Sequence, residues 1–197
     1  NDVIPTAINL STHCGMEHHL LPAIDNLINI IDEKAKKVEG TTKTGRTHLM
    51  DAMPLDMSQE LMAWSSQLRA SQKSLTTVTD QLLALPQGGT AVGTGINAHP
   101  RFSIEFAKEV SRIEKIKAKP SDNFFHSLSS QDTSLQLSGE MRNLATVLMK
   151  ISNDLRWMNS GPLSGLGEIE LQALQPGSSI MPGKVNPVIP EAVTMVC

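Results

Sequence analysis

Tyrosine is absent from the sequence, and other aromatic residues are few: four phenylalanines and two tryptophans among 197 residues. Leucine, isoleucine, methionine and alanine supply most of the apolar side chains instead. Strands favour aromatic and β-branched residues, whereas leucine, methionine and alanine favour helices. The composition therefore predicts an all-α fold of packed helices.

Cysteine is equally scarce. Cys14 and Cys197 are the only two, which is typical of a reducing compartment, and they provide no spacing that would bind zinc or an iron–sulfur cluster. His13 beside Cys14 adds one further ligand type, which is too few for a metal site. We therefore expect no metal and no cofactor.

Long apolar runs and a strong net charge are also missing. No run approaches the length that spans a membrane, and the first residues lack the basic-then-apolar pattern of a signal peptide. The net charge is −3, with both signs interspersed, so nothing indicates nucleic acid or a membrane surface as a partner. These absences predict a cytoplasmic protein, or one of the mitochondrial matrix if the source is eukaryotic.

The length of the chain fits one hydrophobic core, and no linker or internal repeat divides it. The chain opens on Asn1 without a methionine and stops at Cys197 inside an apolar, helix-like stretch. We therefore expect residues 1–197 to form a single domain that is a fragment of a longer protein.

Apolar residues recur at helical spacing along much of the chain. Residues 20–37 have this spacing and end in a basic turn before Gly40. Two longer stretches alternate steps of three and four residues, as in a heptad seam. The first seam is Leu61, Trp64, Leu68, Ser71, Leu75, Val78, Leu82 and Leu85, and the second is Leu137, Met141, Leu144, Leu148, Ile151, Leu155 and Met158. Such seams predict two long helices in bundle geometry, and we expect much of each seam to be buried against other subunits.

A glycine-rich segment, Gly88–Gly95, follows the first seam. It is unlike a phosphate-binding loop, because it follows a helix rather than a strand and lacks the Gly-Lys-Ser/Thr of a P-loop. We interpret it as a tight connection that lets helices approach closely. A shorter amphipathic helix is predicted around Phe102, Phe106 and Val110.

The densest group of polar and turn-forming residues is Gly177-Ser178-Ser179-Ile180-Met181-Pro182-Gly183-Lys184-Val185-Asn186-Pro187. Glycine lets the backbone approach a ligand closely, and exposed N–H groups, hydroxyls and a lysine together suit a small anion. A polar surface loop is the simpler alternative. However, Lys184 and Asn186 lead directly into the apolar stretch 188–196, which favours a binding role.

This stretch resembles the signature loop of the fumarase/aspartase superfamily, and further motifs extend the resemblance along the chain. Gly45-Arg46-Thr47-His48 is similar to the fumarase segment with an active-site Thr-His pair, where aspartases carry glutamine instead of histidine. Gly88-Gly89-Thr90 and Gly183 also follow the fumarase version. The chain therefore resembles the class II fumarases, which use no metal. Leu163 departs from the pattern, since fumarases usually carry arginine there.

The resemblance implies a role for each matching residue. Ser178 would be the base, and His48, oriented by Glu191, would polarise water at the departing hydroxyl. The substrate-binding residues would be Asn1, Thr47, Ser179, Lys184, Val185 and Asn186.

The resemblance also implies an assembly and a reaction. The chain would be the central helical-bundle domain, without the N-terminal and C-terminal domains, of a homotetramer whose active sites are each shared between three subunits. The implied reaction is the reversible hydration of fumarate to L-malate in the citric acid cycle, with a small dicarboxylate as substrate. We expect the 197-residue piece alone to be inactive, because its substrate-binding segments are incomplete. An aspartate ammonia-lyase of the same superfamily and a non-catalytic structural relative remain alternatives.

Overall fold

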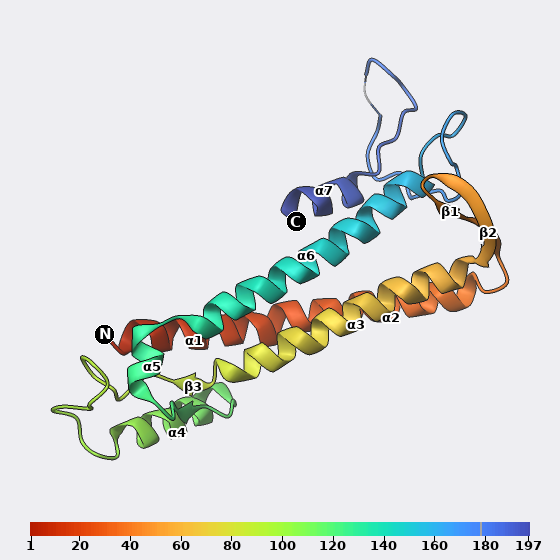
Figure 1. The fold of residues 1–197 in the computed structure, drawn as a ribbon. Helices are drawn as coiled ribbons and strands as arrows, with labels where there is room; N and C mark the ends of the chain where they lie inside the picture. Colours follow the sequence, from red (N-terminus) through yellow and green to blue (C-terminus); the bar gives the residue numbers. More distant parts are fainter. Residues whose placement is uncertain (178) are drawn as a thin grey trace. The chain divides into compact units, whose positions relative to one another are not determined.

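Helices dominate the computed structural model, which describes residues 1–177 and 179–197 (Figure 1), and the all-α fold class is confirmed. The helical elements are α1 (Val3–Gly15), η1 (Met16–Leu20), α2 (Leu21–Lys37), α3 (Met57–Gln81), α4 (Phe102–Glu114), α5 (Phe124–Ser129), α6 (Asp132–Met158) and α7 (Val188–Val196). The short strands are β1 (Thr42–Thr47), β2 (Met50–Asp56), β3 (Ala84–Leu85) and β4 (Lys119–Pro120).

The chain divides into two compact units. The first comprises Asn1–Leu27 and Ala70–Met141, and the second comprises Ile28–Arg69 and Arg142–Cys197. Helices α2, α3 and α6 therefore contribute residues to both units.

In the first unit, α1 continues through the π-helical turn η1 into α2. Asp2, which precedes α1, is buried, and its Oδ2 accepts hydrogen bonds from the backbone N–H groups of Gly88 (2.9 Å) and Thr90 (3.0 Å). These bonds tie the start of α1 to the glycine-rich connection that follows α3.

The glycine-rich connection requires glycine for steric reasons. Gly88 has φ +112°, and a Cβ at this position would lie 2.5 Å from the Cβ of Ser103 in α4. A Cβ at Gly89 would lie 2.8 Å from Leu128 Cδ1 and 2.9 Å from Phe124 Cβ, both in α5. Real side-chain atoms do not approach this closely, so glycine lets the backbone of the connection pack directly against α4 and α5.

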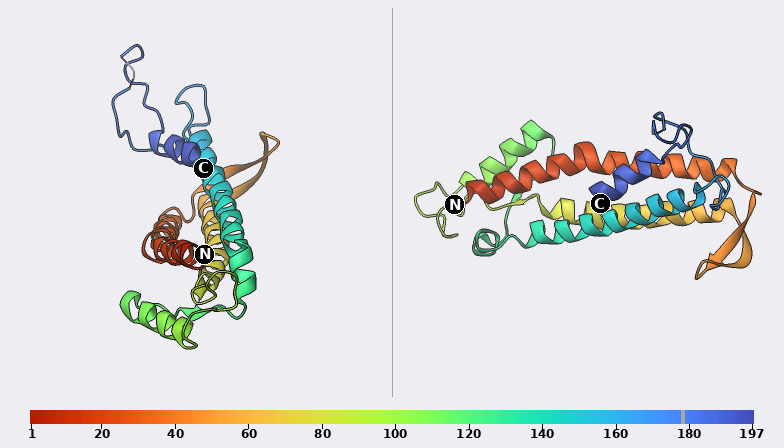
Figure 2. Two further views of the ribbon diagram at one scale, coloured as in Figure 1. Left: turned by 90° about the vertical axis from the view of Figure 1, so that its left-hand side faces the viewer. Right: turned by 90° about the horizontal axis from the view of Figure 1, so that it is seen from above.

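In the second unit, α2 runs along α3, and α6 diverges from them toward its C-terminal end (Figures 1 and 2). Asp32 of α2 accepts hydrogen bonds from Ser65 and Arg69 of α3. The ammonium group of Lys150 in α6 lies 5.6 Å from the ring centroid of Trp64 in α3, within the range of a cation–π contact. These contacts confirm the predicted bundle packing within this unit.

The first heptad seam is buried along its full length within the chain itself. No residue of this seam is more than 5% exposed, although α3 ends at Gln81 and the last two seam residues follow it. The expectation that much of this seam is buried against other subunits is therefore wrong, because the seam is already buried within the single chain. In the second seam, Leu137, Leu144, Ile151 and Met158 are buried, whereas Met141 is 47% exposed.

Two strands that the composition did not indicate, β1 and β2, form an antiparallel hairpin in the second unit. Three threonines in β1 supply the β-branched residues that favour strands. The register shifts between Thr44 and Arg46, because Ala52 and Met53 of β2 stand opposite the single residue Gly45 and form a β-bulge in β2. A Cβ at Gly45 would lie 2.6 Å from the carbonyl oxygen of Met53, which explains why the residue opposite the bulge is glycine.

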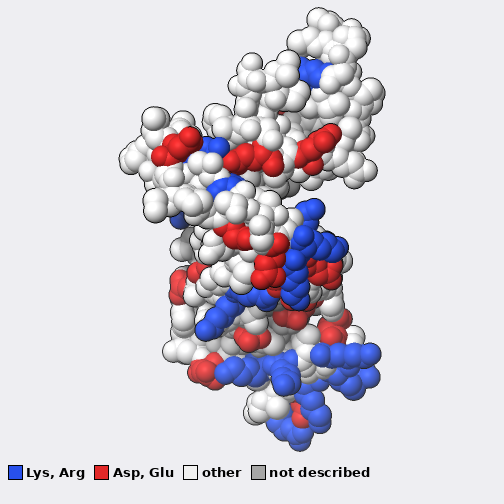
Figure 3. All heavy atoms as spheres, turned by 90° about the vertical axis from the view of Figure 1, so that its right-hand side faces the viewer, with Lys and Arg blue, Asp and Glu red and all other residues white. Residues whose placement is uncertain are grey.

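The described residues include no helix long and apolar enough to cross a membrane. Within the same residues, no cluster of three or more His, Cys, Asp or Glu side chains is arranged to hold a metal ion. Figure 3 shows basic and acidic side chains next to one another over the face in view, in keeping with the interspersed charges of the sequence.

Candidate active site

The Thr47-His48 pair lies at the tip of the β1–β2 hairpin. Thr47 pairs with Met50 at the end of the ladder, so His48 and Leu49 form a two-residue turn. Both turn residues have positive φ, 54° and 63°, as a type I′ turn requires; Asn and Gly normally occupy such positions. Thr47 and His48 are both exposed, so the strained turn presents the histidine to solvent.

The signature loop folds back on itself before α7. A Cβ at Gly177 would lie 2.6 Å from the carbonyl oxygen of Lys184, and Lys184 N donates to Met181 O at 3.2 Å. The two ends of the loop therefore meet at a point where only glycine fits. Ser179 is exposed on this loop, and Ser178, the predicted base, lies outside the described residues.

A pocket of about 450 Å³ lies where this loop, the start of α7 and the end of α6 meet. The loop and α7 contribute Lys184, Val185, Asn186 and Glu191 to its lining. Among the described residues, neither Lys184 nor Glu191 forms an ion pair. The structure thus brings together four of the residues that the sequence predicted for the site, with both charged groups available to a ligand.

The opposite wall of this pocket consists of α6 residues that the sequence analysis did not single out. Asn153 and Arg156, with Asn159 just after the helix, line it. Arg156 Nη1 donates to Asn153 Oδ1 at 3.0 Å, and this arginine has no carboxylate partner among the described residues. A signal was present in the sequence, because these polar residues recur every three positions beside the second seam.

The predicted orienting pair, His48 and Glu191, is not brought together within one chain. The hairpin and α7 lie on different sides of the C-terminal end of α6 (Figures 1 and 2). No hydrogen bond or ion pair joins the two residues in the described part of the chain. Asn1 belongs to the first unit, where its Nδ2 donates to the carbonyl oxygen of Ala91 at 2.8 Å.

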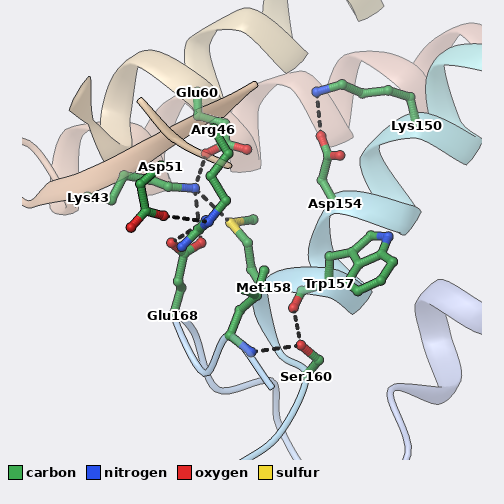
Figure 4. Close-up of polar contacts among 11 residues, drawn as sticks. Lys43, Arg46, Asp51, Glu60, Lys150, Asp154, Trp157, Met158, Ser160 and Glu168 are labelled. Carbon is green, nitrogen blue, oxygen red and sulfur yellow. Dashed lines mark hydrogen bonds and ion pairs between the residues drawn. The ribbon is translucent and has the colours of Figure 1, made fainter. Parts of the chain in front are cut away.

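A charge cluster at the base of the hairpin was also missed (Figure 4). Glu168, in the segment after α6, receives a hydrogen bond from Arg46 Nη1 at 2.8 Å, and its Oε2 lies 3.2 Å from Lys43 Nζ. Lys43 Nζ also donates to Glu60 Oε2 of α3 at 2.5 Å and lies 3.3 Å from the sulfur of Met158. No sequence motif indicates this cluster, because its members are far apart along the chain.

The pKa values in this cluster shift in opposite directions. Burial alone would lower the pKa of Lys43, but its hydrogen bonds to and the charges of Glu60 and Glu168 outweigh burial and raise the pKa above the ordinary 10.5. Burial would likewise raise the pKa of Glu168, but Arg46 and Lys43 hold it below the ordinary 4.5. Both side chains are therefore charged at neutral pH.

The chain is a helical protein with a polar pocket at the C-terminal end of α6. A sequence profile of the family described as "Lyase" matches residues 1–197, and the chain belongs to this family. Among curated relatives, Fumarate hydratase class II 2 of Pseudomonas aeruginosa is 56% identical over 196 residues, which cover all of this chain and 43% of the relative. Fumarate hydratase class II of Xylella fastidiosa (strain Temecula1) is 54% identical and covers the whole chain and 41% of the relative.

A solved structure of recombinant class II fumarase from Schistosoma mansoni superposes on the chain with a TM-score of 0.98 at 39% identity, covering all of this chain and 44% of the other. The resemblance to class II fumarases that the motifs indicated is therefore confirmed. The chain spans less than half the length of the curated relatives it matches.

Proposed function

We propose that the protein catalyses the reversible hydration of fumarate to L-malate, as a class II fumarate hydratase of the citric acid cycle acting in the cytoplasm. The observation that carries this proposal is the pocket that gathers Lys184, Val185, Asn186 and Glu191 in a chain 56% identical to a fumarate hydratase. Lys184 and Arg156 give the pocket cations that suit a dicarboxylate.

The chemistry explains why such groups are needed. Hydration in reverse removes a proton next to a carboxylate, which adds negative charge beside an existing one. A cation and several N–H donors must therefore stand where that charge develops. Lys184, Asn186 and the backbone of Ser179 and Val185 would supply them.

We assign proton removal to Ser178, whose alkoxide the N–H groups of a glycine-flanked loop would stabilise. At the other carbon, His48 would polarise the water that is added or expelled, while Thr47 and Asn1 would hold the substrate carboxylates. Glu191 would orient His48. These roles rest on the motif resemblance, and no cofactor takes part in them.

We further propose that the protein is a homotetramer and that this chain is its central helical domain. The hairpin that carries His48 and the helix α7 that carries Glu191 lie on different sides of α6 (Figures 1 and 2), which supports sites that are shared between subunits. In this arrangement the hairpin tip of one chain would face the signature loop of another, with a third chain completing the site.

The test is the loss of fumarate absorbance in the ultraviolet, measured on the intact protein without and then with ammonia. Consumption in water alone is the expected result. Consumption that requires ammonia would make the protein an aspartate ammonia-lyase. No consumption under either condition would make it a non-catalytic relative.

Substitutions test whether the reaction takes place in this pocket. Ser178→Ala and Lys184→Met should each lower kcat by about 100-fold or more, because each removes a group that acts in the transition state. Lys108→Met, which removes an exposed lysine of α4, should leave turnover unchanged. Near-normal turnover of Ser178→Ala would show that another group is the base.

A further inference from the structure

We infer that Lys43, Arg46 and Glu168 are positioning residues: their charge cluster holds the hairpin tip that carries Thr47 and His48 at a fixed place relative to the end of α6. The inference rests on the proposed function for its effect on catalysis. Its structural half, the anchoring of the hairpin, is independent of that function.

The first step is the direction of the two basic side chains. In a regular strand, residues three apart point to opposite faces, so Lys43 and Arg46 would not meet the same partner. A β-bulge in β2, opposite Gly45, shifts the register of the hairpin between Lys43 and Arg46, and a bulge distorts the ladder locally and redirects side chains. Both cations consequently reach Glu168, at 3.2 Å and 2.8 Å (Figure 4).

The second step is the attachment of Glu168 itself. Its backbone N–H donates to Met158 O at 2.8 Å, and the preceding Gly167 N–H donates to Ser160 O at 2.8 Å. Glu168 is therefore fixed to the C-terminal end of α6, the end that lines the pocket through Trp157 and Ser160. The cluster links the wall of the pocket directly to the residue that precedes Thr47.

The third step is burial. The side chains of Lys43, Glu168 and Arg46 are 12%, 15% and 24% exposed. Ion pairs this far from water contribute little net stability, because desolvation offsets their attraction, yet a broken pair leaves an uncompensated charge. Such a cluster restricts geometry more than it stabilises the fold, which suits a role in positioning.

The hairpin tip needs such an anchor. All residues of the tip are exposed: Thr47, His48, Leu49 and Met50. The two turn residues, neither of them glycine, have a left-handed backbone conformation. Beyond the pairing of its own strands, the tip has few contacts that would fix it. Arg46, one residue from Thr47, is the nearest anchored side chain.

The experiment compares Glu168→Gln with Asp154→Asn in the intact protein. Glu168→Gln keeps the shape of the side chain and removes the charge that Lys43 and Arg46 share. Asp154→Asn is the matched control, since it removes the partner of Lys150 on the same helix and does not touch the hairpin. Hydrogen exchange of the amides of residues 42–56 is measured by mass spectrometry, together with kcat and KM for fumarate.

We expect Glu168→Gln to accelerate exchange in residues 42–56 and to lower kcat about 10- to 100-fold, because displacements of about 1 Å can cost about 100-fold. In Glu168→Gln, KM should change less than kcat. Asp154→Asn should change neither the hydrogen exchange of the hairpin nor kcat. The double variant Arg46→Gln with Glu168→Gln should lose no more kcat than the more impaired single variant, since both substitutions break the same Arg46–Glu168 contact. If Glu168→Gln fails to fold, Arg46→Gln alone carries the same expectations.

If the hairpin amides of Glu168→Gln exchange at the same rate as those of the wild type, the inference is overturned, whatever the kcat of the variant. Faster exchange with unchanged kcat would overturn the positioning role in catalysis. A wild-type protein without turnover, combined with faster exchange in the variant, would refute the proposed function while supporting the anchoring of the hairpin.

Discussion

The charge of Glu168 depends on its two basic neighbours, and this dependence makes the stability of the hairpin sensitive to acid. Arg46 and Lys43 hold the pKa of Glu168 below 4.5 in the folded chain. A carboxyl group with a depressed folded pKa contributes stability above its unfolded pKa, and the contribution is lost as the pH falls through the folded value. For Lys43, with its raised pKa, the contribution is present below about 10.5 and is lost at higher pH.

We therefore predict that the gap in unfolding free energy between the wild type and Glu168→Gln narrows as the pH falls from 7 toward 3. Glutamine resembles the protonated carboxyl, so the variant behaves at every pH as the wild type does in acid. Urea unfolding at a series of pH values measures the gap. A gap that stays constant below pH 4.5 would show that the ion pairs leave the pKa of Glu168 unshifted.

Among the secondary-structure elements, the β1–β2 hairpin combines strain with a predicted catalytic residue. A left-handed conformation costs an L-residue about 1–2 kcal/mol, and both His48 and Leu49 adopt one. Strain of this kind concentrates at functional sites. The presence of histidine where asparagine or glycine would be more stable supports its proposed role.

Leu49→Gly should raise the unfolding free energy by about 0.5–1 kcal/mol, because relief of the left-handed strain exceeds the entropy that glycine costs. Met50→Gly is the control: Met50 is similarly exposed but lies in the extended strand β2, so glycine there should lower the unfolding free energy by about 0.5–1 kcal/mol. Thermal or urea unfolding compares the two variants. If Leu49→Gly and Met50→Gly lower the unfolding free energy equally, Leu49 is not strained.

For the whole molecule, the central question is whether one chain can complete a site. In a single chain, the β1–β2 hairpin and helix α7 lie on different sides of the C-terminal end of α6 (Figures 1 and 2). The hairpin carries His48, and α7 follows the loop that contains Lys184. If sites are shared between subunits, chains lacking His48 and chains lacking Lys184 should complement one another in mixed oligomers.

We predict that equal amounts of His48→Asn and Lys184→Met, each inactive alone, regain about a quarter of wild-type activity when co-expressed, because each site draws the two residues from different subunits of a symmetric assembly. A mixture of Ser178→Ala and Lys184→Met is the control, since both residues lie in one loop. Activity no higher than that of this control would place the complete site within one chain.

Particular residues show how far the sequence reached. The first seam, from Leu61 to Leu85, could be predicted because a heptad pattern is a local signal, and every member of it is buried. The same pattern could not say which surface covers the seam, and the expectation of another subunit was wrong for it. The hairpin was missed because the motif identifies Thr47 and His48 without indicating a strand. The pairing of β1 with β2, and the register shift opposite Gly45, depend on the folded backbone.

By itself, the sequence determined the helical class, the seams, the close approach at Gly88 and Gly89, and the family, since periodicity, glycine sterics and motif spacing are all written along the chain. The tertiary structure alone decided which distant residues meet. It brought Arg156 to the wall of the Lys184 pocket and placed Glu168 between Lys43 and Arg46. These contacts join residues up to 125 positions apart, and only the path of the folded backbone fixes distances between such residues.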